Sequence, residues 1–269
     1  MKNDDIVITS AFRTAIGKFS GSLSSQTAPE LGSTVIKKCV ENSELKKEEV
    51  DMVYMGQVLT AGTGQNPARQ ASILAGLPHE TTNTTVNQVC GSGLASVALA
   101  YNSIKSGDGK LVIAGGQESM SNSPHYMNIR KGIKMGDGKM KDSMIIDGLW
   151  DVYNQYHMGI TAENVAEKFQ IRREEQDSFA AASQRKAAEA IKEKKFVNEI
   201  VPVKIKFKKE EIEFDKDEYP KAESTVEKLA KLRPAFKKDG TVTAGNASGV
   251  NDGAAAVCLM TGEMAIKKN

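Results

Sequence analysis

The sequence is poor in the residues that build disulfide frameworks and metal sites. It has three cysteines and three histidines among 269 residues. The cysteines lack Cys-x-x-Cys spacing, and an odd number cannot all pair within one chain, so we expect a reducing, cytoplasmic compartment. The histidines, His79, His125 and His157, are isolated from one another, and nothing has metal-ligand spacing. The sequence therefore predicts no bound metal.

An excess of charge of one sign is also lacking. Its 36 basic and 34 acidic residues leave a formal net charge of +2, which favours neither a nucleic-acid binder nor a membrane-surface protein. The first ten residues carry acidic groups where a secretory signal needs an apolar run. The uncharged stretch Thr81–Ile104 is too rich in Thr, Asn, Gln and Ser for a membrane helix. A hydrophobic content of 40% favours an ordered globular protein of one or two domains.

Strand and helix patterns alternate along the first 118 residues. Short β-branched or alternating runs predict strands, and apolar residues at three-to-four spacing predict helices. The strands are expected at Ile6–Thr9, Asp51–Gln57, Thr84–Val89 and Leu111–Ala114, the last closed by Gly115-Gly116, and the helices at Pro29–Asn42, Asn66–Ala75 and Leu94–Ile104, the last ended by Gly107. This β-α-β-α-β-α-β order indicates an α/β layer fold with a largely buried sheet.

The pattern changes after Ser119. Residues 119–160 are rich in Gly, Met and Asn, two helical stretches follow near Ala162–Phe169 and Glu174–Lys192, and a Lys/Glu-rich section runs to Asp239. We interpret 119–250 as an inserted, mostly surface-lying region and not a second core of sheet. Residues Ala254–Met260 return to a strand pattern. The expected domains are therefore 1–118, 119–250 and a closing segment 251–269.

The strongest local signal for chemistry is the run from Asn87 to Leu94, Asn-Gln-Val-Cys-Gly-Ser-Gly-Leu. A strand ends there, Cys90 occupies the turn, and a long apolar helix begins. A thiol at a helix N-terminus meets unpaired N–H groups and the positive end of the macrodipole, which favour the thiolate. Gly91 and Gly93 let a substrate carbonyl approach N–H groups that stabilise an oxyanion, as in a nucleophile elbow.

Another interpretation of Cys90 remains open, because free cysteine is among the most buried residue types and Cys90 could be a small buried residue at a helix cap. Cys39 and Cys258 provide the comparison. Cys39 lies on the apolar face of its predicted helix, and Cys258 lies within an apolar strand pattern. Neither has a helix N-terminus or a glycine turn beside it, so we expect both to be core residues.

Six blocks in this order make the sequence resemble the thiolases over nearly its whole length, from Arg13-Thr14 to Gly253. The blocks are Gly64-Gln-Asn-Pro-Ala-Arg69, Asn87-Gln-Val-Cys-Gly-Ser-Gly93, Gly115-Gly-Gln-Glu-Ser-Met-Ser121, His157-Met-Gly-Ile-Thr-Ala-Glu-Asn164, Lys231-Leu-Arg-Pro-Ala-Phe236 and Thr243-Ala-Gly-Asn-Ala-Ser-Gly249. The resemblance implies an α/β fold, the thiolase N-terminal half with a layered mixed sheet, in which Ala254–Met260 completes the sheet. It implies that 119–250 is a loop domain covering coenzyme A.

The resemblance also implies an activity. Cys90 would be acylated by acetyl-CoA in an acetyl-CoA C-acetyltransferase of fatty acid metabolism, with coenzyme A as substrate or product and no separate cofactor. The His157-Met-Gly form of its block looks like that of short-chain, acetoacetyl-CoA-type thiolases. Members of the family pair as dimers or tetramers, so a homo-oligomer is expected. No nucleic-acid or membrane partner is implied.

Carried over from the family's blocks, eight residues of the 119–250 region would bind coenzyme A. They are Leu149, His157, Met158, Lys221, Ala235, Phe236, Ala244 and Ser248. Without the resemblance, Met158 and Phe236 would be core residues and His157 a structural histidine. At Lys221 the family often has an arginine, and lysine keeps the charge but loses the bidentate fork. The basic run Lys204–Lys209 is typical of solvated surface, although some of its lysines could meet phosphates.

Thiolases take further catalytic groups from a C-terminal half, and these are missing here. A Cys-x-Gly cysteine, a Gly-His-Pro histidine and an Asn-Glu-Ala-Phe asparagine do not occur in the 269 residues. We therefore expect a truncated chain that is incomplete for catalysis. The almost wholly apolar helix Leu94–Ile104 is typical of a helix buried on all sides, so a partner half is expected. The alternatives are a non-catalytic module that binds coenzyme A or a thiolase subunit, and a relative from fatty-acid or polyketide condensation.

Overall fold

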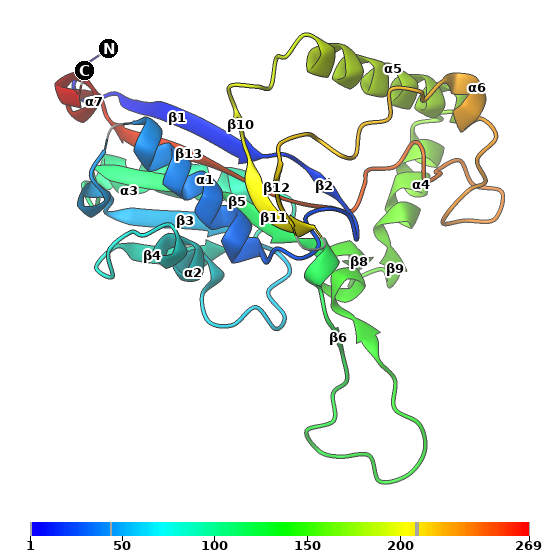
Figure 1. Ribbon diagram of the computed structural model, residues 1–269. Helices are drawn as coiled ribbons and strands as arrows, with labels where there is room; N and C mark the ends of the chain where they lie inside the picture. Colours follow the sequence, from blue (N-terminus) through cyan, green and yellow to red (C-terminus); the bar gives the residue numbers. More distant parts are fainter. Residues whose placement is uncertain (1, 44, 208–209, 269) are drawn as a thin grey trace. The chain divides into compact units, whose positions relative to one another are not determined.

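The computed structural model describes residues 2–43, 45–207 and 210–268 (Figure 1). Lys208 and Lys209 of the basic run, and Asn269 of the closing segment, lie outside the described residues. The chain forms two compact units. Unit 1 comprises Met1–Pro124, Glu199–Glu218 and Asn251–Asn269, and unit 2 comprises His125–Asn198 and Tyr219–Val250.

Unit 1 is built on a seven-stranded mixed sheet. Its strands lie in the order β10-β1-β13-β5-β3-β4, and β2 pairs with β13. The strands are β1 Ile6–Thr14, β2 Gly17–Lys18, β3 Met52–Gly56, β4 Thr82–Val86, β5 Leu111–Ser119, β10 Ile200–Val201 and β13 Asn251–Thr261. The strand β13 runs antiparallel to both β1 and β5, whereas β3 is parallel to β4 and β5. The segment predicted at Ala254–Met260 therefore completes the sheet at its centre.

Helices cover both faces of this sheet. Leu111 and Ile113 of β5 pack in one apolar cluster with α1, whereas Val112 and Ala114 pack in a second cluster with α3. Successive strand residues point to opposite faces, so α1 and α3 lie on opposite sides of the sheet. The helices of unit 1 are α1 Ala28–Asn42, α2 Pro67–Leu74, α3 Ser92–Ser106 and α7 Gly262–Lys268, and the 3₁₀ turns are η1 Lys47–Glu49 and η2 Met120–Asn122.

Local signals set the helix ends close to where the sequence predicts them. Thr27 and Glu30 form a capping box at the start of α1, which satisfies N–H groups that the first turn leaves unpaired. Gly107 ends α3 in the left-handed conformation, with a φ of 84°. Glycine takes this conformation without steric cost. The predictions for α1, α2 and α3 are therefore confirmed to within two residues.

Two predicted features of the sheet differ from the structure. Gly115 and Gly116 do not close a strand but lie inside β5, which runs on to Ser119. A Cβ atom on Gly115 would lie 2.0 Å from the carbonyl oxygen of Ala255, so the glycine allows β5 and β13 to approach closely. The strand expected at Thr84–Val89 also ends earlier, at Val86, and a turn separates it from α3.

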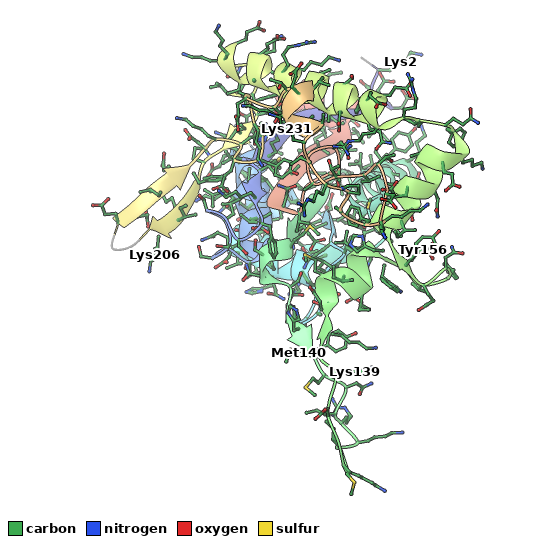
Figure 2. All side chains as sticks on the ribbon, turned by 90° about the vertical axis from the view of Figure 1, so that its right-hand side faces the viewer. Lys2, Lys139, Met140, Tyr156, Lys206 and Lys231 are labelled. Atoms are coloured by element: carbon green, nitrogen blue, oxygen red, sulfur yellow. The ribbon has the colours of Figure 1, made fainter. Side chains whose placement is uncertain are left out.

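Unit 2 is mainly helical. It contains α4 Met158–Lys168, α5 Arg173–Lys192 and α6 Val226–Leu229, the π-helix η3 Met144–Leu149, and the short paired strands β6 His125–Tyr126 with β7 Lys141–Asp142 and β8 Trp150–Asp151 with β9 Tyr156–His157. The two predicted helices are thus present, each beginning earlier than expected. Lys139 and Met140 lie along the long loop that β6 and β7 close (Figure 2).

The region 119–250 is divided between the two units. Glu199–Glu218 clusters with unit 1, because β10 pairs in parallel with β1. The hairpin of β11 Val203–Phe207 and β12 Glu210–Phe214 follows, and its Val203 and Ile205 are buried in the unit 1 core. The reading of 119–250 as one surface-lying insertion is therefore wrong for this stretch. No helix in the described part of the chain is long and apolar enough to cross a membrane.

Candidate functional site

Cys90 lies in the turn between β4 and α3, and its side chain is exposed. Gly91 is the N-cap residue of α3, so the thiol stands one residue before the cap of a 15-residue helix. The Gly91 N–H donates to Gln88 O at 3.0 Å, and the Ser92 N–H donates to Val89 O at 3.0 Å. These bonds close the turn in which the cysteine is presented at the positive end of the helix.

The residue before the cysteine has an unusual backbone. Val89 has a φ of +49°, in the left-handed region. A β-branched residue rarely takes this conformation, and the cost is about 1–3 kcal/mol. A valine at position 89 gives no sequence signal for this conformation, which a glycine or asparagine would have indicated. Such strain is common at catalytic turns, where the surrounding structure holds it in place.

Glycines let the strands approach the start of α3. A Cβ atom on Gly56, the last residue of β3, would lie 2.6 Å from the carbonyl carbon of Ser92 and 2.7 Å from the N atom of Gly93. Gly56 pairs with Gly116 of β5 in the sheet. The helix N-terminus can therefore lie directly on the ends of two strands, and the main chain of Gly93 remains accessible to a ligand.

Cys90 lines an open depression of about 380 Å³ within unit 1. The depression is formed by main chain and side chains from β3, β5, β13 and the start of α3. Its lining includes Arg13, Gly56, Val58, Val89, Cys90, Ser92, Gly93, Gly116, Glu118 and Asp252. The arrangement offers a thiol, a helix N-terminus and a glycine surface to one small ligand.

Two acidic groups and one basic group line the same depression. Burial raises the pKa of Glu118, although its carboxylate accepts the Val58 N–H at 2.8 Å. Asp252 is 1% exposed and accepts both the N–H (2.9 Å) and the hydroxyl (2.6 Å) of Ser121. Arg13 donates two hydrogen bonds to the carboxylate of Asp217, at 2.7 and 2.9 Å. The charges therefore have structural partners within unit 1.

Cys39 and Cys258 are fully buried, as predicted. Burial raises the pKa of the Cys39 thiol to about 12 and that of Cys258 to about 11. The Cys39 thiol donates to Ala256 O at 3.4 Å. Both side chains are therefore core residues that stay protonated at neutral pH.

In unit 2, the residues of two predicted blocks are in direct contact. The His157 and Phe236 rings stack with their centroids 5.0 Å apart. His157 caps α4, because its Nδ1 accepts the Gly159 N–H at 3.0 Å. A Cβ atom on Gly159 would lie 2.1 Å from a ring carbon of Phe236. The glycine of the His157-Met-Gly block therefore makes room for Phe236 from the other block.

Other predicted ligand residues of unit 2 lie along these elements. Leu149 directly precedes Trp150, which pairs with His157, so the β8–β9 pairing brings Leu149 close to Met158 in the fold. Ala235 donates its N–H to Val242 O at 2.9 Å. An isolated bridge between Pro234 and Thr243 places the segments of Phe236 and Ala244 side by side. Ser248 is exposed beyond this bridge.

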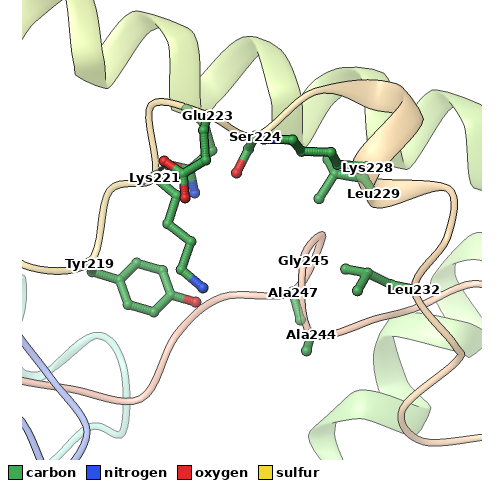
Figure 3. A pocket seen from close by; sticks show the side chains of 11 residues that line it. Tyr219, Lys221, Glu223, Ser224, Lys228, Leu229, Leu232, Ala244, Gly245 and Ala247 are labelled. Carbon is green, nitrogen blue, oxygen red and sulfur yellow. Dashed lines mark hydrogen bonds between the residues drawn. The ribbon is translucent and has the colours of Figure 1, made fainter.

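Lys221 and Ala244 line a second depression, of about 250 Å³, in unit 2 (Figure 3). The Lys221 side chain projects into it beside Tyr219, and Leu229 and Leu232 lie on the opposite side. The main-chain N–H of Lys221 donates to Gln184 Oε1 at 2.7 Å, which ties this segment to α5. A cation, a phenol and apolar side chains together suit a ligand with an anionic and a planar part.

Two buried carboxylates of unit 2 were not singled out by the sequence analysis. Glu163 is 4% exposed, and it accepts the N–H groups of Thr241 (2.9 Å) and Val242 (2.8 Å). Asp177 is 1% exposed and receives Arg173 Nε at 2.8 Å and Asn246 Nδ2 at 2.9 Å. Glu163 and Asn246 lie within two of the blocks that resemble the thiolases, so the sequence indicated that these positions matter. It did not indicate that their side chains are buried hydrogen-bond partners.

The structure thus distributes the predicted site residues over both units. Cys90 lies in unit 1, and all eight predicted coenzyme A residues lie in unit 2. Within unit 2, His157 contacts Phe236, and Lys221 shares a depression with Ala244. Among residues 2–43, 45–207 and 210–268, no three His, Cys, Asp or Glu side chains are placed to share a metal ion.

Comparisons with known proteins agree on one family. A family model described as the thiolase N-terminal domain matches residues 6–263. The chain is 57% identical over 259 residues to an acetyl-CoA acetyltransferase of Pseudomonas aeruginosa, covering 96% of this chain and 66% of that protein. It is 59% identical over 263 residues to one of Chromobacterium violaceum, covering 97% and 67%.

A solved structure has the same fold. The crystal structure of the Bacillus anthracis acetyl-CoA acetyltransferase matches with a TM-score of 0.95 and 41% sequence identity, covering 99% of this chain and 68% of that one. The mixed sheet is thus that of a known class of α/β protein. The chain belongs to the thiolase family. It spans 66% of the length of the Pseudomonas relative.

Proposed function

We propose that this chain is the acyl-accepting part of a thiolase-type acyltransferase, an acetyl-CoA C-acetyltransferase, with Cys90 as the nucleophile. The observation that carries the proposal is the exposed Cys90 thiol at the N-terminus of α3, in a depression lined by glycine main chain. Relatives named acetyl-CoA acetyltransferase support acetyl-CoA as the acyl donor. We also propose a role in fatty acid metabolism.

In the first stage, the Cys90 thiolate attacks the carbonyl carbon of acetyl-CoA. A bond forms between Sγ and this carbon, the bond from the carbon to the coenzyme A sulfur breaks, and coenzyme A leaves as a thiolate that takes up a proton. The positive end of the α3 dipole, beside which Cys90 lies, stabilises the negative charge on the carbonyl oxygen during the attack. Coenzyme A is a substrate and product, so this stage needs no other cofactor.

The second stage needs proton transfers. A second acetyl-CoA loses an α-proton, and its carbanion attacks the acetyl thioester to give acetoacetyl-CoA and free Cys90. The Cys-x-Gly, Gly-His-Pro and Asn-Glu-Ala-Phe motifs that the family uses are absent from these 269 residues. We expect acetoacetyl-CoA thiolysis by these residues alone to remain far below ~10 s⁻¹, the median for enzymes. The rate of thiolysis is measured as the loss of 3-ketoacyl-CoA absorbance in the presence of coenzyme A. A rate near the median would contradict the expectation that these residues alone cannot complete the reaction.

Coenzyme A is the ligand proposed for the eight residues of unit 2. Supporting this are the stacked pair His157 and Phe236, and the depression where Lys221 lies beside Tyr219. A lysine ammonium there suits a phosphate as a point charge. Association with a second copy or with a C-terminal thiolase half is proposed for the exposed face of α3, where Leu94 is 78% exposed.

Acetylation of the chain tests the proposal directly. Incubation with acetyl-CoA at neutral pH is expected to add one acetyl group to the peptide that contains Cys90, as read by mass spectrometry after digestion. The matched controls are Cys90→Ser, which should remove the acetylated peptide, and Cys258→Ser, which should not. No acetylation at Cys90, or equal acetylation at all three cysteines, would contradict the assignment.

A non-catalytic module is the second candidate. It is favoured by the apolar side chains exposed along α3, which suit a binding partner. Such a module would bind coenzyme A through unit 2 without accepting an acetyl group at Cys90. Calorimetry with coenzyme A, combined with the acetylation assay, distinguishes the two: binding without acetylation supports the module.

A further inference from the structure

Both main-chain polar groups of Val89 are bound by side chains from either side of the turn. Its N–H donates to Asn87 Oδ1 at 3.0 Å, and its carbonyl accepts from Ser92 Oγ at 2.6 Å in addition to the Ser92 N–H at 3.0 Å. Ser92 Oγ also accepts the Gln88 N–H at 2.8 Å. One hydroxyl therefore ties together the two residues that precede Cys90.

The side chain of Val89 does not explain its left-handed backbone. It is 51% exposed, so packing of the isopropyl group does not hold the residue at a φ of +49°. A β-branched residue left to itself would return to an extended or right-handed conformation. The hydrogen bonds to the Val89 main chain are thus the visible restraint on this conformation.

Ser92 is held firmly enough to act as that restraint. It is 4% exposed in the first turn of α3. Its Cβ would lie 2.7 Å from a Cβ placed on Gly56, so the end of β3 lies directly against it. Because Ser92 is packed between α3 and the end of β3, its hydroxyl has a fixed anchor from which it can restrain the turn.

We propose that Ser92 is the positioning residue for the Cys90 thiol. Its hydroxyl keeps Val89 left-handed, and the conformation of Val89 sets the direction in which the chain enters Cys90 and then α3. The proposal rests on the proposed role of Cys90 as the acetylated nucleophile. It predicts that loss of the hydroxyl leaves the fold intact but turns the thiol away from the position in which it attacks a thioester.

Ser96 offers a matched control one helical turn further on. It is 0% exposed, and its hydroxyl lies 2.6 Å from the carbonyl oxygens of Gly93 and Gly115, so it bonds within α3 and toward β5. Ser96→Ala removes the same chemical group from the same helix face as Ser92→Ala. Both variants therefore lose the stability contributed by one buried hydroxyl group. Only the hydroxyl of Ser92 contacts the turn that precedes Cys90.

The test measures two rates at Cys90 in each variant. The first is acetylation by acetyl-CoA, and the second is alkylation by iodoacetamide. Ser92→Ala is expected to slow acetylation about tenfold or more, a loss of about 1.4 kcal/mol in the transition state, and to slow alkylation less. Ser96→Ala is expected to change neither rate by more than about twofold. Cys39 and Cys258 report on folding, because they alkylate only when the core opens.

In a parent chain that is acetylated at Cys90, an equal rate in Ser92→Ala, or an equal loss in Ser96→Ala, would overturn the proposal. If Ser92→Ala unfolds the chain and exposes Cys39, the same substitution is made in a chain that also carries Val89→Gly. Val89→Gly permits the left-handed conformation without a restraint, so adding Ser92→Ala to it should cost at most about threefold and leave the core closed. The same loss in both backgrounds, or an unfolded double variant, would overturn the proposal.

The alkylation comparison does not involve acetyl-CoA. It therefore tests the positioning role of Ser92 even if the parent chain is never acetylated at Cys90. A lack of acetylation would contradict the proposed function but not the proposal that Ser92 holds the turn. In that case slower alkylation of Cys90 in Ser92→Ala, with unchanged alkylation in Ser96→Ala, still supports positioning. Unchanged alkylation in both variants would then count against it.

Discussion

The ring of Phe236 stacks on the imidazole of His157, with their planes inclined by 18°. The contact depends on Gly159, whose missing side chain leaves the space that the Phe236 ring occupies over the first turn of α4. Two segments almost 80 residues apart in the sequence are joined by it. His157 thereby acquires a defined orientation: one nitrogen caps a helix, and one ring face covers an aromatic side chain.

Gly159→Ala is expected to disrupt this stack. Its new Cβ would lie 2.1–2.4 Å from three Phe236 ring carbons, so the ring must move. Overpacking of this kind costs about 1–3 kcal/mol, and under the proposed function coenzyme A binding should weaken as well. Urea unfolding and calorimetry measure the two effects.

Phe236→Ala supplies the control for Gly159→Ala. With the ring removed, the added methyl group has space, so the penalty of Gly159→Ala should largely disappear in the double variant. A penalty that is the same with and without the Phe236 ring would mean that the glycine is needed for the helix and not for the stack.

Glu163→Gln is expected to destabilise unit 2 by about 2–3 kcal/mol. One oxygen, Oε1, accepts both the Thr241 and the Val242 N–H groups, and Oε2 also accepts the Thr241 N–H at 2.9 Å. An amide removes the charge that strengthens these bonds and places an NH₂ group against the Thr241 N–H. The control is Glu167→Gln, one turn further along α4, whose side chain is 76% exposed. Urea unfolding should show a loss for the first variant and almost none for the second.

The Glu163 carboxylate also predicts how the stability of the fold changes at acidic pH. Burial opposes the charge of Glu163, but the N–H groups of Thr241 and Val242 outweigh it, so its pKa lies below the ordinary value of 4.5. A carboxylate with a lowered folded-state pKa stabilises the fold above 4.5 and loses this contribution as pH falls through its lowered value. The stability difference between the parent chain and Glu163→Gln should therefore shrink below pH 4.5. A difference that grows there would contradict the sign.

The three cysteines should differ in reactivity with pH. Limiting iodoacetamide at neutral pH is expected to label Cys90 well before Cys39 and Cys258, because Cys90 alone of the three is exposed. The other thiols have pKa values of about 12 and about 11 and are buried. Peptide mapping by mass spectrometry reads the order. Equal labelling of all three in the native chain, or labelling of Cys39 first, would refute the prediction.

Alkaline pH should also weaken the fold through the buried thiols. A cysteine that ionises near 9 when unfolded but near 11 when folded favours the unfolded state between these values, by up to about 1.4 kcal/mol per pH unit. Cys258→Ala removes this one contribution, so its unfolding free energy should fall less steeply than that of the parent chain from pH 9 to 11. Parallel curves in urea would contradict the prediction.

The exposed face of α3 predicts association. Leu94 and Tyr101 are 78% and 47% exposed, whereas Ser92, Ser96, Ala100 and Ile104 are buried, so the helix described as buried on all sides has one open face in this chain. Open apolar faces of a few hundred Å² are uncommon on soluble monomers. We expect the 269-residue chain to self-associate at micromolar concentration, unless a polypeptide matching the remaining third of its relatives is supplied.

Sedimentation with Leu94→Ser tests which surface is responsible. This change should shift the chain toward monomer, whereas Leu74→Ser, at a 58% exposed leucine on α2, should not. If the parent chain sediments as a monomer and fails to bind a hydrophobic dye, the face of α3 does not drive association. An equal effect of both variants would place the contact elsewhere.

Local patterns predicted the helices and the cysteine turn well. Helix periodicity and the glycine at position 107 depend on residues within one or two turns, so α1, α3 and the position of Cys90 before α3 could be read directly. The burial of the Glu163 and Asp177 carboxylates could not be predicted from local sequence patterns. Glu163 and Asp177 look like ordinary surface residues of amphipathic helices, and their burial depends on Thr241 and Asn246, more than 60 residues away.

The amino-acid sequence by itself determined the family, the nucleophile candidate and the apolar surroundings of Cys39 and Cys258, because each depends on neighbours along the chain. Only the tertiary structure decided which strands pair. It places β13 between β1 and β5, continues β5 through Gly115, and brings β10 to the sheet edge. Hydrogen bonds between strands join residues far apart in sequence, and a local pattern does not specify their partners.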